Sequence, residues 1–382
     1  MPWAETEPMK ERMRFVADWE RGHYAVSELC VRYGISRKTG YKWLDRYEAE
    51  GVAGLGERSR APRHCPHRIE PRVARALVEA RRQHPSWGPR KLLAWLVQRH
   101  PGLELPAAST AGDLLKRRGL IKRRRRRHPW KHPGAPGLVT EQANDVWTAD
   151  FKGQFRTGDG EYCYPLTIAD QHSRYLLACE ALDSIKGTGV RPVFLRLFRE
   201  VGLPRAIRTD NGVPFATTGI HGLSWLNVWW IRLGIAHQRI EPSHPEQNGA
   251  HERMHRTLKA ETARPPAQTH LGQQRRFNQW RSEYNHERPH ESLADRPPAT
   301  VWWPSPREYP STIPKPEYPG HHLVRLVSNS GCFRWHARQI FLSQALEQQH
   351  IGLEETNDGI WSICFYNVVL GKLDERDFRI HA

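Results

Sequence analysis

Apolar positions near the start of the chain recur at helical spacing. Within residues 8–21 they stand three positions apart, and a second short run over residues 25–33 ends at Gly34. Ser36 can cap a third helix directly after that turn. Three short helices with a tight turn before the third follow the order of a helix-turn-helix. The pattern therefore predicts a helix-turn-helix DNA-binding domain over residues 1–60.

The third of these helices begins with basic and aromatic side chains. The early residues of a recognition helix meet base edges or phosphates. We therefore expect DNA contacts from Arg37, Lys38, Tyr41 and Lys42. A three-helix module whose basic face is only solvated remains the alternative.

A second helical unit is predicted over residues 66–120. Its first apolar stripe consists of Val73, Ala76, Leu77 and Ala80, and two further amphipathic segments follow it. A unit of this size and position is expected to be a second helical DNA-binding domain.

The segment over residues 121–143 is expected to be a basic linker. Its like charges repel one another and it offers nothing apolar to bury, so it cannot fold on itself. We expect it to lie along a phosphate backbone, and a linker that is only solvated is the alternative. Its arginine run consists of Arg123, Arg124, Arg125, Arg126 and Arg127.

The apolar pattern changes from helical to alternating at Asn144. Strand-like segments flank turn signals at residues 158–160 and 170–173, and helical and strand-like segments then alternate up to a helix that begins near Gly249. Three antiparallel strands followed by alternating helices and strands describe a mixed α/β layer. This order fits a ribonuclease H-like catalytic core, which we expect over residues 144–302.

Alternation of apolar and polar positions returns towards the end of the chain. From His321 onwards, short strand-like runs are separated by turn signals at residues 329–331 and 357–359. The pattern predicts a small β-barrel-like domain over residues 303–382, so that the whole chain is a multidomain α/β protein. DNA binding and a purely structural role both suit this last domain.

The chain of 382 residues is strongly basic, with 58 Lys+Arg against 41 Asp+Glu and a formal net charge of +17. Such a surface attracts a polyanion and releases counterions on binding, so we expect double-stranded DNA as a partner. No apolar run is long enough to cross a bilayer, and the six cysteines show no CxxC spacing. We therefore expect a cytoplasmic, nucleoid-associated protein with no membrane partner.

Two acidic residues stand at strand ends in this basic chain. Asp150 lies late in the first strand of the predicted core, and Asp210 lies at the C-terminal end of a later strand. If these strands are adjacent, both carboxylates emerge at one end of the sheet. Two such anions repel each other unless a cation lies between them, and hard oxygen ligands suit Mg²⁺ or Mn²⁺. A third carboxylate would complete a two-metal site.

Two glutamates compete for the third position. Glu246 falls in a loop between proline and an Asn-Gly pair, whereas Glu252 lies one turn into a helix. From Glu252, Arg256 and Lys259 follow at i+4 and i+7 on the same helix face. One face thus offers a metal ligand and two phosphate contacts, which favours Glu252.

Four motifs in order resemble the retroviral-integrase-type catalytic core of insertion-sequence DDE transposases. They are "WTADF", "RTDNGVPF", "HPEQNGAHERMHRTLK" and "YNHERPHESLADRPPATVW". The resemblance implies Asp150, Asp210 and Glu252 as catalytic residues and as ligands of two Mg²⁺ (or Mn²⁺) ions per active site. The interval between Asp210 and the glutamate is longer than usual in that family, and we expect the extra residues within 216–230.

The resemblance also implies a function. We expect a transposase that binds terminal inverted repeats, cleaves to give 3′-OH ends and joins them to target DNA by two-metal-ion phosphoryl transfer. Pairing two DNA ends implies self-association as a dimer or higher oligomer. The alternative is a non-catalytic DNA-binding regulator derived from a transposase, and a metal-dependent nuclease without joining activity is a further one.

Overall fold

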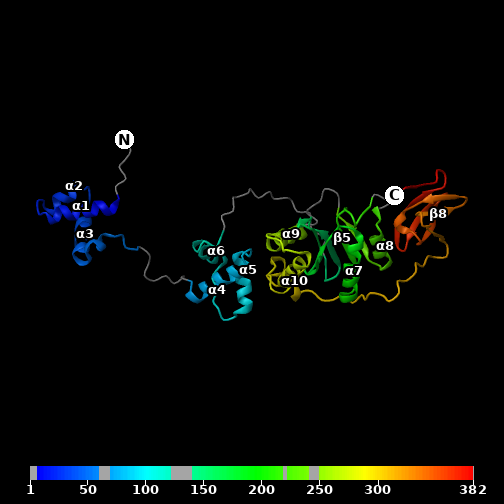
Figure 1. Ribbon diagram of the computed structural model, residues 1–382, viewed down its shortest axis with the longest axis horizontal. Coiled ribbons are helices and arrows are strands. Elements are labelled where there is room, and N and C mark those ends of the chain that lie inside the picture. The colour runs from blue at the N-terminus through cyan, green and yellow to red at the C-terminus, as the bar shows by residue number, and fades with distance from the viewer. Residues whose placement is uncertain (1–6, 60–68, 122–139, 218–221, 241–248, 382) are drawn as a thin grey trace. The chain divides into compact units, whose positions relative to one another are not determined.

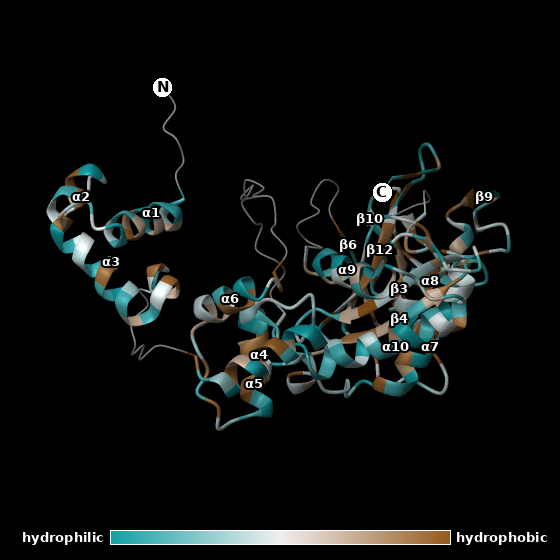
Figure 2. Ribbon diagram, turned by 60° about the vertical axis from the view of Figure 1, so that its left-hand side comes forward, coloured by the Kyte–Doolittle hydropathy of each residue, from teal (hydrophilic) through white to brown (hydrophobic). Residues whose placement is uncertain are grey.

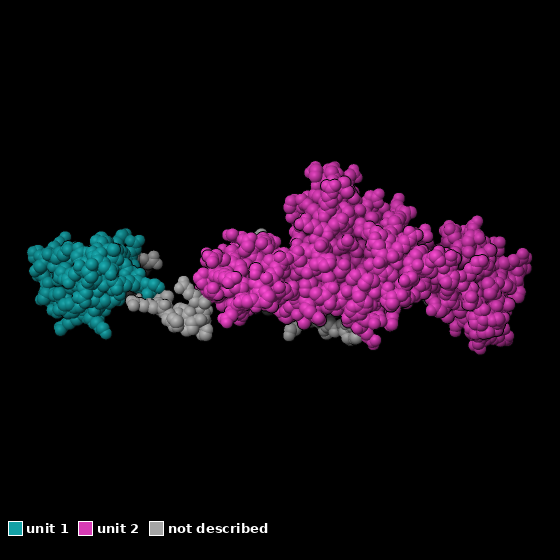
Figure 3. All heavy atoms as spheres, turned by 90° about the horizontal axis from the view of Figure 1, so that it is seen from below, with its two compact units in different colours: residues 1–68 teal, residues 69–382 magenta. Residues whose placement is uncertain are grey.

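The computed structural model describes residues 7–59, 69–121, 140–217, 222–240 and 249–381 (Figure 1). The chain divides into two compact units, residues 1–68 and residues 69–382 (Figure 3). Among the described residues, no helix is long and apolar enough to cross a bilayer.

The first unit contains the three helices expected from the apolar spacing. They are α1 (Pro8–Glu20), α2 (Val26–Arg32) and α3 (Arg37–Glu50). The Ser36 side chain caps α3 by accepting a hydrogen bond from the Thr39 amide at 3.2 Å. Gly40 lets α3 cross close to α2, because a Cβ at this position would lie 2.5 Å from the Cys30 sulfur. The expectation of a three-helix module with a turn before its third helix is thus confirmed.

The second unit begins with another three-helix bundle. Helices α4 (Pro71–Gln83), α5 (Pro89–Arg99) and α6 (Ala108–Arg117) enclose a core that includes Leu77 and Leu92. The buried residues of α4, Val73, Leu77 and Ala80, recur at helical spacing, which explains why the apolar stripe predicted this helix.

The central sheet is mixed, as the order of elements predicted. Its strands run in the order β4-β3-β1-β5-β6, and a short β2 also pairs with β3. Strand β3 is antiparallel to β1 and β4, whereas β5 is parallel to both β1 and β6. The strand bounds are β1 (Val146–Phe151), β2 (Phe155–Arg156), β3 (Tyr162–Asp170), β4 (Leu176–Leu182), β5 (Ala206–Thr209) and β6 (Ala236–Arg239).

Helices cover both faces of this sheet, and the alternation of side chains along each strand decides which face each residue meets. Trp147, Ala149 and Ile207 pack against α7 (Gly187–Val201) and α8 (Trp225–Arg232). Cys163 and Cys179 pack against α9 (Gly249–Thr262) and α10 (His270–His286) on the other face. Figure 2 shows apolar residues gathered on the strands between these helices.

The C-terminal strands form two sheets. Five strands pair in the antiparallel order β13-β12-β11-β10-β7, and β8 pairs only with β9. Their bounds are β7 (Leu323–Leu326), β8 (Cys332–Trp335), β9 (Arg338–Phe341), β10 (His350–Asn357), β11 (Ile360–Phe365), β12 (Val368–Asp374) and β13 (Arg379–His381).

The expected small β-barrel is not confirmed, because among the described strands the two sheets are not closed by pairing. The turn at residues 357–359 does join a hairpin, but β7 pairs with the distant β10 rather than with β8. Apolar packing takes the place of closure: Leu353 and Ile363 of the larger sheet share a core with Phe333 and Trp335 of the smaller one.

Candidate active site

The two aspartates follow adjacent parallel strands. The pairing of β1 with β5 ends at Ala149 opposite Thr209, so Asp150 and Asp210 are each the next residue along the chain. Neighbouring strands lie about 4.8 Å apart. The expected adjacency of these strands is confirmed, and both aspartates leave the sheet at the same end.

The alternation of side chains turns Asp150 towards α9. Trp147 and Ala149 face α7 and α8, so Thr148 and Asp150 face the opposite side of the sheet. Asp210 is exposed and its carboxylate accepts a hydrogen bond from the Gly212 amide at 3.2 Å. Asp150 therefore lies on the face of the sheet that α9 covers.

Glu252 lies in the first turn of α9 and shares a surface pocket of about 550 Å³ with Asp150. Cationic side chains make up much of the remaining lining: Lys152, Arg256, Lys259 and Arg264. Asp210 does not line this pocket. The competing Glu246 lies outside the described residues.

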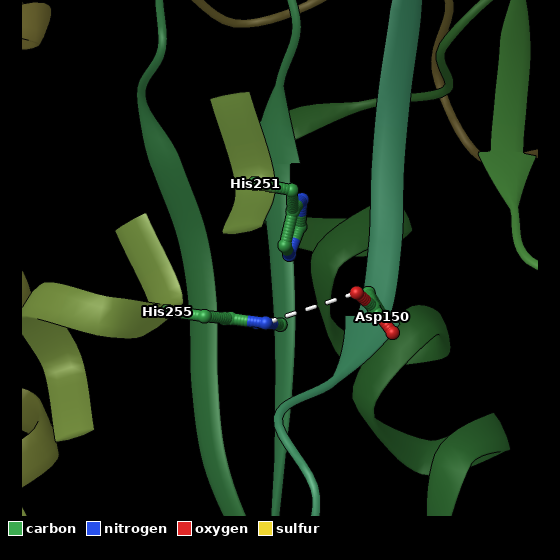
Figure 4. A group of neighbouring side chains, drawn as sticks. All are labelled: Asp150, His251 and His255. Atoms are coloured by element: carbon green, nitrogen blue, oxygen red, sulfur yellow. Dashed lines mark ion pairs between the residues drawn. The ribbon is translucent and has the colours of Figure 1, made fainter. Parts of the chain in front are cut away.

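Two buried histidines of α9 lie next to Asp150. His251 and His255 point inward from α9, and each presents Nε2 to the Thr167 hydroxyl at 2.6 Å. His251 Nδ1 lies 3.0 Å from the hydroxyl of Thr148, and His255 Nδ1 lies 3.7 Å from Asp150 Oδ2. Figure 4 shows the His255 ring directed at the Asp150 carboxylate.

Burial keeps both imidazoles neutral. It lowers the pKa of His251 to about 3. It also lowers the pKa of His255 to about 2, with smaller contributions from His251 and Lys152. These three side chains, Asp150, His251 and His255, bring potential metal-ligating atoms within 4.8 Å of one another.

The two buried histidines are not among the site residues predicted from the sequence, although the helical pattern contains a signal for them. His251, Met254, His255 and Leu258 stand at the i, i+3, i+4 and i+7 spacing of a buried helix face. The prediction from sequence rests on the exposed face of this helix, which carries Glu252. Two histidines on the apolar face of a helix that also carries a candidate ligand indicate side chains buried next to the site.

The residues proposed for DNA contact are accessible where the structure describes them. Arg37, Lys38, Tyr41 and Lys42 are exposed on the early turns of α3. Arg256 and Lys259 are exposed on α9. The run Arg123 to Arg127 lies outside the described residues.

Basic side chains of the second helical bundle contact acidic residues of the core. Arg90 pairs with Glu291 at 2.8 Å and with Asp295 at 2.9 Å. Arg99 pairs with Glu287 at 2.7 Å. Some basic side chains of the predicted second DNA-binding domain therefore form ion pairs within the chain.

Known domain families match the N-terminal helices and the central sheet separately. The integrase core domain matches residues 140–245 and, in a second family of the same description, residues 233–298. A helix-turn-helix domain matches residues 11–63, and a homeodomain-like domain matches residues 39–115.

Two similar proteins come from insertion elements. The chain is 27% identical over 294 residues to the uncharacterized 39.2 kDa protein of insertion element IS476 from Xanthomonas euvesicatoria, covering 75% of this chain and 80% of that protein. It is 29% identical over 194 residues to the uncharacterized 31.7 kDa protein of insertion element IS407 from Burkholderia multivorans, covering 47% and 63% respectively.

One solved structure with some likeness is the HTLV-2 integrase catalytic core domain in complex with magnesium. It is 16% identical, with a TM-score of 0.34, and the match covers 44% of this chain and 99% of that chain. Another is the simian T-cell lymphotropic virus intasome in complex with PP2A regulatory subunit B56 gamma, at 14% identity and a TM-score of 0.37, covering 80% and 98%. The matches in sequence confirm the expected resemblance to insertion-sequence transposases, because helix-turn-helix domains and an integrase core domain match the chain and similar proteins come from insertion elements.

Proposed function

We propose that the chain is a DNA transposase that binds terminal inverted repeats, cleaves to give 3′-OH ends and joins these ends to target DNA. The observation that carries the proposal is the convergence of carboxylates at one sheet edge. Asp150 and Asp210 follow adjacent strands, and Glu252 shares a pocket with Asp150. An integrase core domain supports a nucleic-acid-processing enzyme of the DDE type.

The donor set suits hard divalent cations. Carboxylate oxygens are the ligands that Mg²⁺ and Mn²⁺ prefer, and carboxylates on neighbouring strands repel each other without a cation. We assign Asp150, Asp210 and Glu252 as the residues that would hold two Mg²⁺ or Mn²⁺ ions. Bound there, such ions would supply activation of the attacking oxygen and charge stabilisation of the leaving oxygen.

The surrounding side chains favour a phosphodiester substrate. Lys152, Arg256 and Lys259 line the same pocket as the carboxylates. Their role in the proposal is to bind the phosphates on either side of the scissile bond and to hold the strand in line for displacement. No covalent enzyme intermediate is required, so no serine, tyrosine or cysteine nucleophile takes part.

The other parts of the chain provide DNA binding in this proposal. Residues 1–60 and 66–120 bind the element ends, and residues 121–143 follow the phosphate backbone. Residues 144–302 catalyse the reaction, and residues 303–382 form the C-terminal domain. Two ends are paired by a dimer or higher oligomer, and the protein acts on DNA in the cytoplasm at the nucleoid.

Strand joining tests the proposal. A labelled duplex that carries the element's own flanking repeat is incubated with a plasmid target, Mg²⁺ and the full chain. We expect joined product from the wild type and a loss of at least 100-fold with Asp210→Asn and with Glu252→Gln, because each removes a charged ligand. Glu246→Gln is the matched control, and it should retain joining.

Three outcomes would change the assignment. Full joining by Asp210→Asn would refute the metal-dependent mechanism. Loss of joining only with Glu246→Gln would show that Glu246 is the third ligand. Binding of the repeat without any cut or joined product, in Mg²⁺ or in Mn²⁺, would instead support the non-catalytic regulator.

A further inference from the structure

We propose that four cationic side chains around Tyr284 bind a phosphate of the DNA backbone: Lys91, Arg174, Arg253 and Arg288. They come from four separate segments, which are α5, the turn between β3 and β4, α9, and the segment that follows α10. The inference rests on the proposed function, because it takes DNA as the bound partner. It adds a contact outside the pocket that contains the candidate carboxylates.

Three arginines surround the Tyr284 side chain. The guanidinium carbon of Arg288 lies 5.9 Å from the centre of the Tyr284 ring. Burial raises the pKa of Tyr284 to about 12, and the charges of Arg288, Arg174 and Arg253 oppose that rise. The phenol therefore stays protonated at pH 7, and its hydroxyl has no hydrogen-bonding partner among the described residues. Three positive charges and an unused hydrogen-bond donor thus converge.

Lys91 extends the cluster on the side of the second helical bundle. The His290 ring lies 4.8 Å from the Tyr284 ring, measured between centroids. Burial lowers the pKa of His290 to about 3, and the charges of Lys91, Arg288 and Arg174 lower it further. The pKa of Lys91 itself falls to about 8, through burial and then through the charge of Arg288. Like charges that act on one another in this way repel, and an anion among them would offset the repulsion.

The nearby carboxylates do not neutralise this charge. Glu261 reaches the Arg288 guanidinium only at 3.5 Å. Glu291 and Asp295 pair with an arginine of α5 at 2.8 Å and 2.9 Å. All three carboxylates act on Lys91 from further away, yet its pKa is still lowered. Within the part of the chain that the structure describes, no carboxylate lies within 4 Å of the charged groups of the other three cations.

The backbone at Arg174 also indicates a specific role. Its φ of 63° lies in the left-handed region, which is uncommon for a residue other than glycine. The preceding turn is held by Asp170, whose carboxylate accepts a hydrogen bond from the Ser173 amide at 2.8 Å. The Arg174 side chain is half-buried, and its guanidinium donates no hydrogen bond to a described residue. Strained conformations of this kind cluster at functional sites.

The position of the cluster favours a phosphate of DNA over a free phosphate. Arg253 directly follows Glu252 on α9, and Arg256, which lines the pocket with Glu252, lies three residues further on the same helix. Both arginines are exposed. A strand bound at the candidate carboxylates carries further phosphates on either side, and arginine binds phosphate oxygens in pairs. The exposed surface of α9 therefore connects the pocket with the cluster.

The salt dependence of DNA binding tests this contact on the full chain. Affinity for a duplex that carries the element's own flanking repeat is measured over a range of salt concentrations. We expect Arg174→Gln/Arg253→Gln to reduce the slope of log affinity against log salt by about one, because one phosphate contact is lost. The matched control is Arg199→Gln/Arg275→Gln, which removes two exposed arginines of α7 and α10 and should leave the slope unchanged.

Ethylation of single phosphates locates the contact on the DNA. An ethylated phosphate has lost its charge, so ethylation at a contacted position weakens binding by the wild type. At one such position the effect should disappear in Arg174→Gln/Arg253→Gln and persist in the control variant. Arg253 is exposed, so Arg253→Gln alone should weaken the effect at this position even where the double variant fails to fold. An unchanged slope together with an unchanged ethylation pattern would overturn the inference.

Inorganic phosphate distinguishes the second source of the same chemistry. Thermal denaturation is compared in phosphate and in chloride at equal ionic strength. Stabilisation by phosphate that is lost in Arg174→Gln/Arg253→Gln, with no change in the slope or in the ethylation pattern, would assign the cluster to free phosphate. That result would overturn the contact with DNA.

The inference and the proposed function fail in different ways. Joined product from the wild type, with an unchanged slope and ethylation pattern in Arg174→Gln/Arg253→Gln, overturns only the phosphate contact. A reduced slope and a lost ethylation effect, without any cut or joined product from the wild type, support the contact and refute the proposed catalysis. Failure of the wild type to bind DNA overturns both.

Discussion

Replacing Thr167 with valine should loosen the junction between α9 and the central sheet. The Thr167 side chain is fully buried, and its hydroxyl is the shared partner of His251, His255 and the Asp150 carbonyl. Valine has a similar shape, so the substitution removes hydrogen bonding without leaving a large cavity. The Nε2 atoms of the two imidazoles then remain buried without a hydrogen-bonding partner.

The cost follows from these two nitrogen atoms. A buried donor or acceptor left without a partner costs about 1–3 kcal/mol, so two of them cost roughly 2–6 kcal/mol. A loss of about 3 kcal/mol corresponds to a roughly 100-fold rise in the population of locally opened molecules. The effect should be greatest in β1, β3 and the start of α9, where the network lies.

Native-state hydrogen exchange followed by mass spectrometry measures this opening segment by segment. Peptides that cover β1 and β3 should exchange faster in Thr167→Val by about that factor. Thr262→Val is the matched control on α9: Thr262 is also buried, but its hydroxyl bonds only to the Leu258 carbonyl one turn earlier. That variant should lose less than about 1 kcal/mol.

The reasoning would be refuted by Thr167→Val exchanging no faster in β1 and β3 than Thr262→Val. Such a result would mean that the two imidazoles find other partners at little cost.

Three further predictions concern other parts of the chain. Gly352→Ala should destabilise the C-terminal sheet by about 1–3 kcal/mol in thermal denaturation, because the new Cβ would lie 2.5 Å from a Tyr318 ring whose hydroxyl is tied to the His350 carbonyl; an unchanged melting temperature would contradict this. Replacing Arg37 and Lys38 together by alanine should weaken DNA binding and reduce the slope of log affinity against log salt by about two, and an unchanged slope would exclude phosphate contacts by these residues. Acid should destabilise the core: burial lowers the pKa of His251 to about 3, below the unfolded value of about 6.5, so the unfolded state binds more protons. Stability should therefore fall as the pH drops below 6.5, by up to about 1.4 kcal/mol per pH unit for this histidine, and denaturant titrations that give equal stability at pH 7 and pH 5 would contradict the assignment.

The apolar pattern predicted the helices and strands because each exposes one face and buries another. Val16 in α1, Leu77 in α4, and the alternating Trp147 and Ala149 in β1 are buried, and they carry local periods that depend only on backbone geometry. The expected barrel was not confirmed, because strand pairing does not follow from local patterns. A strand's own pattern gives its faces but not its partner, and β7 pairs with β10 across more than twenty intervening residues.

The sequence by itself determined the basic charge, the strand-end aspartates Asp150 and Asp210, and a helix that carries Glu252 beside Arg256. These follow from composition and from local periodicity. Only the tertiary structure decided that β1 and β5 are neighbours, that Glu252 shares a pocket with Asp150, and that His255 is directed at the Asp150 carboxylate. The physical reason is that these relations join residues far apart in the chain, where strand register and helix packing, rather than any local preference, fix which side chains meet.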